Sequence, residues 1–117
     1  MTNASIHFCE NDGTSEAIIY VHGDGYPEGA GKDLETFLKE VQKHVPDNRF
    51  HCPHYLAAKF VVWQAKQIRK DNKSNHYLDF LSLGIMPQDA GDISYRYKII
   101  CNGIEGKALP KIITEKV

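Results

Sequence analysis

The side chains best suited to chemistry in this chain stand close together, in a glycine-rich segment that runs from His22 to Lys32. An imidazole, two carboxylates and a phenol alternate with other residues there, at His22, Asp24, Tyr26 and Glu28. A histidine near a carboxylate can act as a general base, and the same polar and aromatic groups can also grip a partner or a small ligand. We therefore predict that this segment carries the function.

Four of the chain's nine glycines fall in this segment, and glycine costs backbone entropy unless its conformational freedom is used. The composition therefore predicts a loop with a specified backbone. One interpretation is a plain connector, in which Tyr26 and Pro27 start a turn and Gly29 and Gly31 supply positive φ angles. The other is a rigid patch at the end of a sheet, formed by the four polar and aromatic side chains. The sequence leaves both interpretations open.

Known phosphate-binding patterns do not fit this segment. The P-loop pattern requires a glycine where Tyr26 stands, and the dinucleotide-binding pattern G-x-G-x-x-G requires one where Glu28 stands. A helix N-terminus attracts phosphate, but Asp24, Glu28 and Asp33 would repel it here. A phosphate cradle is therefore not favoured.

Hydrophobic periodicity predicts the elements that position the segment. Period-two alternation and β-branched composition predict strands at residues 5–10, 17–22, 77–85, 93–101 and 108–114. The pair Asn102-Gly103 predicts a hairpin turn between the last two strands. Pro110 cannot donate to a ladder, so the final strand is expected to be short or to lie at an edge.

Two helices are predicted between the second and third strands. The first runs from an N-cap at Asp33 to Val45, and Pro46 stops it. The second starts at Pro53 and runs to Lys70. The order is ββααβββ, and we expect a single α+β domain over residues 1–117, with an antiparallel sheet and two helices packed on one of its faces.

The second predicted helix is apolar around most of its circumference, so it must be covered on more than one side. Its narrow polar strip contains Lys59, Lys66 and Lys70. Tyr55, Val62 and Trp63 are hard to bury in a two-layer monomer. We therefore expect a homodimer interface, or another partner interface, on this helix.

Composition excludes several classes of protein. A formal net charge of −1 over 117 residues suits one globular domain and lacks the basic footprint of a nucleic-acid binder. Tyr95 and Tyr97 alternate with Arg96 and Lys98, so the aromatic and basic side chains face opposite ways and nucleic acid is not favoured as a partner. No apolar run could span a membrane and no secretory signal is evident, so we expect a cytoplasmic protein without membrane attachment.

The cysteine and histidine pattern predicts no metal site and no cofactor. The three cysteines stand far apart and form no C-x-x-C pair, which argues against a disulfide framework and a zinc ribbon. His51, Cys52 and His54 form one crowded group, whereas a zinc site needs a second spaced pair. We expect Cys52 and His54 to pack against the sheet near the start of the second helix.

Residues 19–29 read Ile-Tyr-Val-His-Gly-Asp-Gly-Tyr-Pro-Glu-Gly and follow Ile6-x-Phe8 and a turn at Asp12-Gly13. This run resembles the I-Y-x-H-x-D-G-Y-P-x-G signature near the N-terminus of a group of small uncharacterised phage and prophage proteins. The group has no assigned activity. The resemblance implies a phage-type accessory protein, and small phage proteins of this kind often act by binding a host protein. Some of them block CRISPR or other bacterial defence systems.

We therefore expect a protein that binds a host protein or defence complex, such as a CRISPR effector, in the cytoplasm of the host cell. Its expected binding residues are His22, Asp24, Tyr26 and Glu28. The alternative is a small enzyme or nucleotide-binding protein in which His22 and Asp24 form an acid/base pair. No spacing marks a nucleophile, so the sequence favours binding over catalysis without deciding between them.

Overall fold

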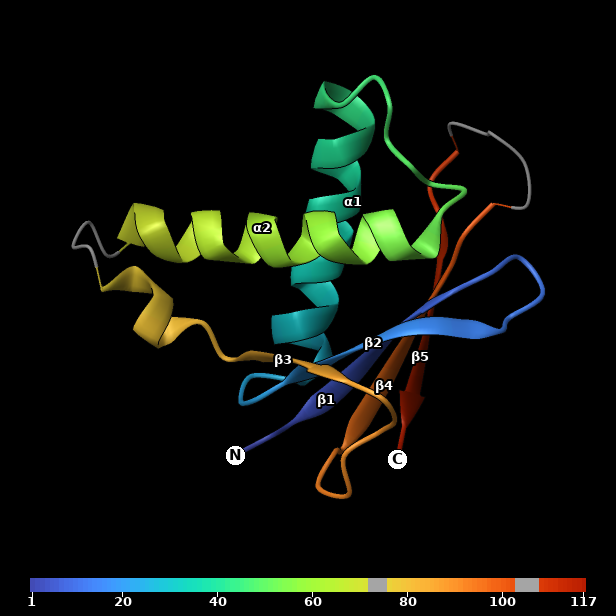
Figure 1. Ribbon diagram of the computed structural model, residues 1–117. Coiled ribbons are helices and arrows are strands. Elements are labelled where there is room, and N and C mark those ends of the chain that lie inside the picture. The colour runs from blue at the N-terminus through green and yellow to red at the C-terminus, as the bar shows by residue number, and fades with distance from the viewer. Residues whose placement is uncertain (72–75, 103–107) are drawn as a thin grey trace.

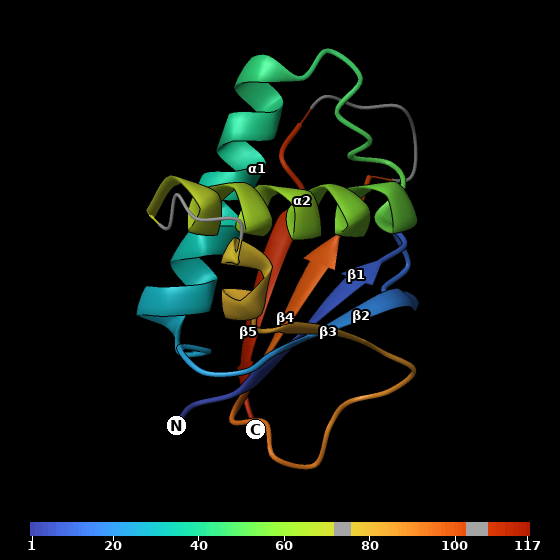
Figure 2. The same ribbon diagram turned by 60° about the vertical axis from the view of Figure 1, so that its left-hand side comes forward.

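A computed structural model of the chain describes residues 1–71, 76–102 and 108–117. Five strands form one sheet: β1 (Ala4–Cys9), β2 (Ser15–Val21), β3 (Leu83–Met86), β4 (Tyr95–Ile100) and β5 (Lys111–Lys116). Helices α1 (Lys32–His44) and α2 (Pro53–Asp71) cross one another over one face of this sheet, as Figures 1 and 2 show. The α+β class predicted from sequence is confirmed, with both helices packed against the sheet.

The sheet is mixed rather than wholly antiparallel, which corrects one detail of the prediction. The strand order is β3-β2-β1-β4-β5, and β1 pairs with β4 in parallel along its whole length. The other neighbouring pairs are antiparallel. Parallel strands need a long crossover, which β2, both helices and β3 supply here. Hairpin signals in the sequence reveal short-range pairing only, so they do not place β4 beside β1.

The edges of the sheet are β3 and β5. The edge position of β5 agrees with the expectation from Pro110. Gly103, in the predicted hairpin turn, lies outside the described residues, although β4 and β5 do pair in antiparallel fashion.

The core lies between the sheet and the helices. Phe8 of β1 and Tyr97 of β4 point to this side and are fully buried, as the predicted strand alternation requires. The Phe60 ring of α2 joins the layers, because its centroid lies 6.2 Å from that of Phe8 and 5.3 Å from that of Phe37 in α1. The buried face of α1 consists of Leu34, Phe37, Leu38 and Val41, at the intervals of three and four residues that place side chains on one face of a helix.

The strand predicted over residues 77–85 is only partly right. Residues Tyr77–Phe80 form a short 3-10 helix, and β3 begins at Leu83. The sheet register pairs Leu83 with Val21, the last residue of β2, so the residues before β3 have no strand beside them. The N–H groups of Asp79 and Leu81 donate locally to the carbonyls of His76 and Leu78, and the Ser82 carbonyl accepts from the His22 N–H just past the end of β2.

The start of α1 also differs from the prediction. A π-helical turn over Pro27–Gly31 leads directly into the helix at Lys32, so Asp33 is not its N-cap. The Asp33 side chain lies in the first turn, where Oδ2 accepts a hydrogen bond from Gln64 Nε2 at 3.2 Å. Asp33 therefore connects α1 to α2.

Helix α2 begins at Pro53, as predicted. Cys52 is half-buried, but His54 is exposed and meets the sheet only through the tip of its side chain, which corrects the expectation that it packs there. Its Nε2 lies 3.5 Å from Glu16 Oε2. The position after Pro53 points away from the core because successive helical side chains are turned by about 100° around the axis.

Candidate functional site

The glycine-rich segment leaves β2 through a left-handed turn. Gly23 and Asp24 have φ angles of 83° and 54°. Aspartate is one of the few residues other than glycine that tolerate this region. The Gly23 N–H donates to Asn3 Oδ1 and the Gly25 N–H to the Thr2 carbonyl, both at 2.9 Å. These bonds fasten the segment to the start of β1 and specify its backbone.

Gly29 and Gly31 serve close packing rather than positive φ, which corrects the connector interpretation. A Cβ on Gly29 would overlap the Asp24 carbonyl oxygen, which accepts a hydrogen bond from the Ala30 N–H at 2.9 Å. A Cβ on Gly31 would lie 3.3 Å from Cε1 of Tyr97. The π-helical turn therefore requires Gly29 for space, and a side chain at Gly31 would press on the Tyr97 ring.

Tyr97 anchors the segment from the core. Its hydroxyl donates to the Gly25 carbonyl at 2.7 Å. Burial raises the pKa of Tyr97 to about 12, so the hydroxyl stays protonated and remains a donor at neutral pH. On its other side Gly25 lies against β1, since a Cβ there would be 2.8 Å from the Ala4 Cβ. The segment is thus clamped between two strands.

The four side chains predicted as a site fall into two groups. His22 and Asp24 line a pocket of about 190 Å³ at the end of β2. Tyr26 and Glu28 are exposed and are not among its lining residues. The Tyr26 hydroxyl reaches Asp24 Oδ1 only at 3.4 Å, the long end of hydrogen-bond distances. Only half of the predicted patch therefore faces a cavity.

His22 has a phenol rather than a carboxylate as its partner. Within the described residues no hydrogen bond joins it to Asp24, and its Nδ1 lies 3.2 Å from the Tyr20 hydroxyl. That hydroxyl donates to Asp92 Oδ2 at 2.9 Å, so it can only accept from His22. The geometry therefore assigns the ring proton to Nδ1 and leaves Nε2 as the acceptor.

Asp33 and Gln64 line the same pocket, although their sequence patterns do not mark them as site residues. Burial raises the pKa of the Asp33 carboxyl, the hydrogen bond from Gln64 opposes this, and the nearby Asp24 charge adds to it. Phe60 and Phe80 supply apolar walls. The pocket suits a small ligand that carries hydrogen-bond donors. In the sequence, the sign of this pocket is Gln64, a polar residue on an otherwise apolar side of α2.

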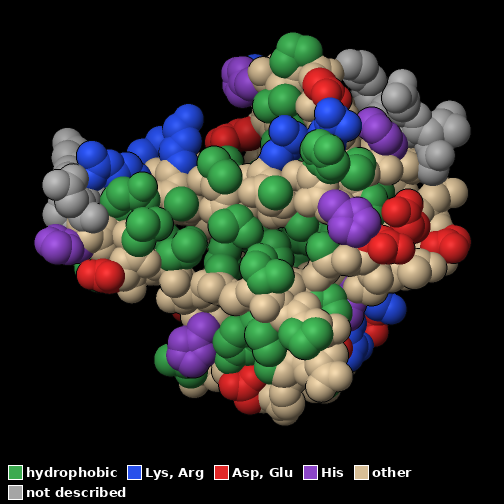
Figure 3. Space-filling view, in the orientation of Figure 1, with side chains coloured by type: hydrophobic (Ala, Val, Ile, Leu, Met, Phe, Trp, Pro, Cys, Tyr) green, Lys and Arg blue, Asp and Glu red, His purple; other side chains and the backbone are tan. Residues whose placement is uncertain are grey.

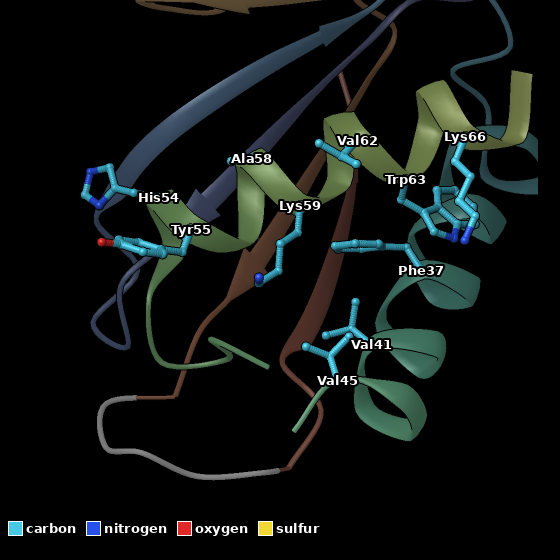
Figure 4. A pocket seen from close by; sticks show the side chains of 10 residues that line it. All are labelled: Phe37, Val41, Val45, His54, Tyr55, Ala58, Lys59, Val62, Trp63 and Lys66. Atoms are coloured by element: carbon cyan, nitrogen blue, oxygen red, sulfur yellow. The ribbon is translucent and has the colours of Figure 1, made fainter. Parts of the chain in front are cut away.

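A larger groove, of about 710 Å³, lies between α1 and α2 (Figure 4). Its apolar lining consists of Phe37, Val41, Val45, Tyr55, Ala58, Val62 and Trp63. Tyr55 and Val62 leave 53% and 68% of their surface exposed. Figure 3 shows hydrophobic side chains gathered over α2. The prediction that one chain leaves part of α2 uncovered is confirmed for Tyr55 and Val62, whereas Trp63 is half-buried and packs against the Phe37 and Phe60 rings.

The charged groups that line this groove are cationic. Lys59 and Lys66 of α2 extend over it, with His54 at one end (Figure 4), and the described lining residues include no aspartate or glutamate. Two carboxylates contact lining residues from the edge of the groove: Glu40 Oε2 accepts a hydrogen bond from the Trp63 Nε1–H at 2.6 Å, and Glu16 Oε2 lies 3.5 Å from His54 Nε2. The indole N–H is therefore satisfied already, and the groove combines apolar walls with positive charge.

The opposite face of the sheet carries a hydrogen-bond network that the sequence pattern does not reveal. His7 Nδ1 lies 2.8 Å from Ser15 Oγ, and His7 Nε2 lies 2.6 Å from Asp89 Oδ1. Arg96 Nη2 lies 2.7 Å from Asp89 Oδ2. Burial opposes the ionised form of Asp89, but the bonds from His7 and Arg96 outweigh it and lower its pKa to about 2.

The network has a clear structural role. The order Ser15, His7, Asp89 is that of a hydrolase relay, in which the carboxylate stabilises a charged imidazole. Here the Arg96 guanidinium already neutralises the carboxylate. Asp89 instead fastens the segment before β4 to β1 and β4, because its partners lie on those two strands.

Comparisons with known proteins do not assign a site. The chain matches no protein-family model, no curated protein and no solved structure. Over the ranges that the structure describes, no group of three or more His, Cys, Asp or Glu side chains is placed to hold a metal ion. No helix in those ranges is long and apolar enough to cross a bilayer. The choice between the pocket at the end of β2 and the groove between α1 and α2 therefore depends on their shape, exposure and charge.

Proposed function

We propose that this protein acts by binding a host protein and that the groove between α1 and α2 is the binding surface. The exposure of Tyr55 and Val62, beside Phe37 and Trp63 in a hollow of about 710 Å³, carries the proposal. Apolar surface in contact with water is unfavourable, and large exposed apolar patches mark interaction sites. Contact with a partner would remove this surface from water.

The wider role that we propose is inhibition of a bacterial defence complex, such as a CRISPR effector, in the host cytoplasm. The resemblance of residues 19–29 to small phage and prophage proteins supports this role. An inhibitor of this kind needs a surface that recognises its target by shape and apolar contact, which the groove offers. A homodimer through α2 would cover the same surface and is the competing occupant.

A second candidate function is small-ligand binding, or acid/base chemistry, at the pocket lined by His22 and Asp24. The supporting observation is that both face one cavity of about 190 Å³ together with Asp33 and Gln64. In an enzyme, His22→Ala should abolish turnover while substrate still binds. In a binding protein, the same change should give a graded loss of affinity.

Affinity capture from a bacterial host that carries defence systems tests the proposal. Val62→Asp places a charge in the groove, and Ile85→Asp makes the same change at another exposed branched residue, on the edge strand β3. We expect wild type and Ile85→Asp to capture the same host protein and Val62→Asp to lose it. Capture that survives Val62→Asp but is lost in Tyr26→Ala would move the binding surface to the glycine-rich segment and contradict the groove.

A further inference from the structure

We infer that the groove holds an amphipathic helix of the partner, with apolar side chains along one face and carboxylates beside them. This inference rests on the proposed function, because it names the kind of host-protein segment that the groove would take. The backbone chemistry of the walls, the spacing of the lining residues and their charge lead to it.

The walls of the groove offer side chains but few groups that could bind a peptide backbone. The lining residues belong to α1, α2 and the residue after α1, and the backbone hydrogen bonds of a helix run within the helix. The two edge strands of the sheet, β3 and β5, supply no lining residue. The Trp63 N–H is already bonded to Glu40. An extended peptide would bury peptide groups without partners, whereas a helix satisfies them internally.

The lining residues form two helical stripes, which set the length of the occupant. On α2 they run from Tyr55 to Lys66 at intervals of three and four residues, which covers about 17 Å of helix axis. On the other side Phe37, Val41 and Val45 follow at intervals of four. A helix of about three turns that lies along the α2 stripe would match its length, and the side chains of the crossing helix α1 would contact it from the other side.

The charged residues of the groove determine which side chains the occupant should carry beside its apolar face. Lys59 and Lys66 are positive, and in the part of the chain that the structure describes no aspartate or glutamate shares the lining with them. Among the described residues, the ion pairs of lysine and arginine are formed by Arg49, Arg96 and Lys98, and not by Lys59 or Lys66. Carboxylates on the occupant would pair with the two lysines, whereas lysine or arginine there would be repelled.

The same charges disfavour a second copy of this chain as the occupant. In a two-fold symmetric pair the groove would face itself, which would bring Lys59 and Lys66 of both copies together around an apolar centre. Among the described lining residues no carboxylate would offset the repulsion, and the Glu40 carboxylate at the edge is held by the Trp63 N–H. A membrane surface would attract the lysines but would leave a concave groove of about 710 Å³ unfilled. An acidic helix satisfies both the charge and the shape.

Three synthetic peptides of about 18 residues, with the full chain as the receptor, test this inference. Two carry leucines along one helical face, flanked by glutamates in one peptide and by lysines in the other. The third has the composition of the glutamate peptide with the leucine pattern scrambled. Trp63 is the chain's single tryptophan and lines the groove, so its fluorescence reports occupancy when the peptides contain no tryptophan.

We expect the glutamate peptide to bind about tenfold more tightly than the lysine peptide at low salt. The reason is that Lys59 and Lys66 would each form an exposed ion pair with the glutamate peptide but would repel the lysine peptide. The preference should shrink in about 1 M salt. The double variant Lys59→Glu/Lys66→Glu should reverse it, with circular dichroism as the check on folding. Val62→Asp should weaken binding of the glutamate peptide, whereas Ile85→Asp should not.

Equal affinity for the two leucine-patterned peptides, tight binding of the scrambled peptide, or an unchanged preference in the double variant would overturn the inference. Binding to anionic vesicles without binding to peptides would assign the groove to a membrane, and a dimer that Val62→Asp dissociates would assign it to a second copy; either result overturns it. Host-protein capture that depends on Val62 but shows no peptide preference would leave the proposed function standing. A preference for the glutamate peptide without capture of any host protein would support the inferred occupant but contradict the proposed function.

Discussion

Replacement of Gly25 by alanine should destabilise the fold, and the structure sets the size of the effect. The new Cβ would lie 2.8 Å from the Ala4 Cβ and 2.9 Å from the Ala4 backbone nitrogen. Carbon atoms in favourable contact lie about 3.5–4.0 Å apart, so the segment has to move by about 1 Å. The obstructing atoms belong to the buried central strand β1 and cannot rotate away.

This displacement strains two hydrogen bonds of Gly25, its N–H to the Thr2 carbonyl at 2.9 Å and its carbonyl to the Tyr97 hydroxyl at 2.7 Å. Overpacking costs about 1–3 kcal/mol and each weakened bond about 1 kcal/mol. We therefore expect Gly25→Ala to lower the free energy of unfolding by about 3 kcal/mol. In a chain of 117 residues this corresponds to a fall in Tm of about 12 °C.

Urea denaturation followed by circular dichroism measures this loss, and Gly91→Ala is the matched control. A Cβ on Gly91 would meet nothing within 4 Å, and its φ lies outside the left-handed region. That variant should stay within about 0.5 kcal/mol of wild type. If Gly25→Ala is as mild as Gly91→Ala, the segment is not clamped between β1 and Tyr97, and the steric reasoning is refuted.

Three further changes test other parts of the structure. Tyr97→Phe leaves the buried Gly25 carbonyl without its donor, so urea denaturation should show a loss of about 1–2 kcal/mol. Because the pKa of Asp89 is about 2 in the folded protein against an ordinary 3.8, its contribution is present above pH 3.8 and is lost as pH falls through about 2. With solvent screening this amounts to about 1–2 kcal/mol in unfolding curves taken across that range, and Asp89→Asn should flatten the acid limb. Val62→Asp should alter stability by less than about 0.5 kcal/mol in a thermal melt, since the side chain is 68% exposed, and a larger loss would attribute its binding defect to unfolding.

The sequence predicts half of the groove. Helical periodicity shows that α2 has more apolar surface than one layer can cover, and Tyr55 and Val62 are exposed in the structure as expected. The contribution of Val41 and Val45 is not predictable in this way. It depends on how α1 crosses α2, and periodicity describes each helix alone.

The glycine-rich segment shows the same limit. Its composition correctly predicts a specified backbone, but the positive φ angles fall at Gly23 and Asp24 rather than at Gly29 and Gly31. The reason is a contact that composition cannot show, because the π-helical turn folds Gly29 against the Asp24 carbonyl.

Contacts between residues that are far apart in the chain cannot be predicted from these sequence patterns. His7 and Asp89 stand 82 residues apart and form a contact of 2.6 Å because the segment before β4 returns across the second face of the sheet. The parallel pairing of β1 with β4 is equally remote in sequence. Turn residues and periodicity encode neighbours along the chain, so they leave such contacts undetermined.

Site-specific photo-cross-linking in living bacterial host cells tests most directly whether the groove is the binding surface. A photoreactive amino acid replaces Val62 in the groove and, in a control protein, Ile85 on the edge strand; both positions are highly exposed. We predict a covalent adduct with one host protein from position 62 and none with that protein from position 85. An adduct from position 85 alone, or the same adducts from both positions, would contradict the groove as the binding surface.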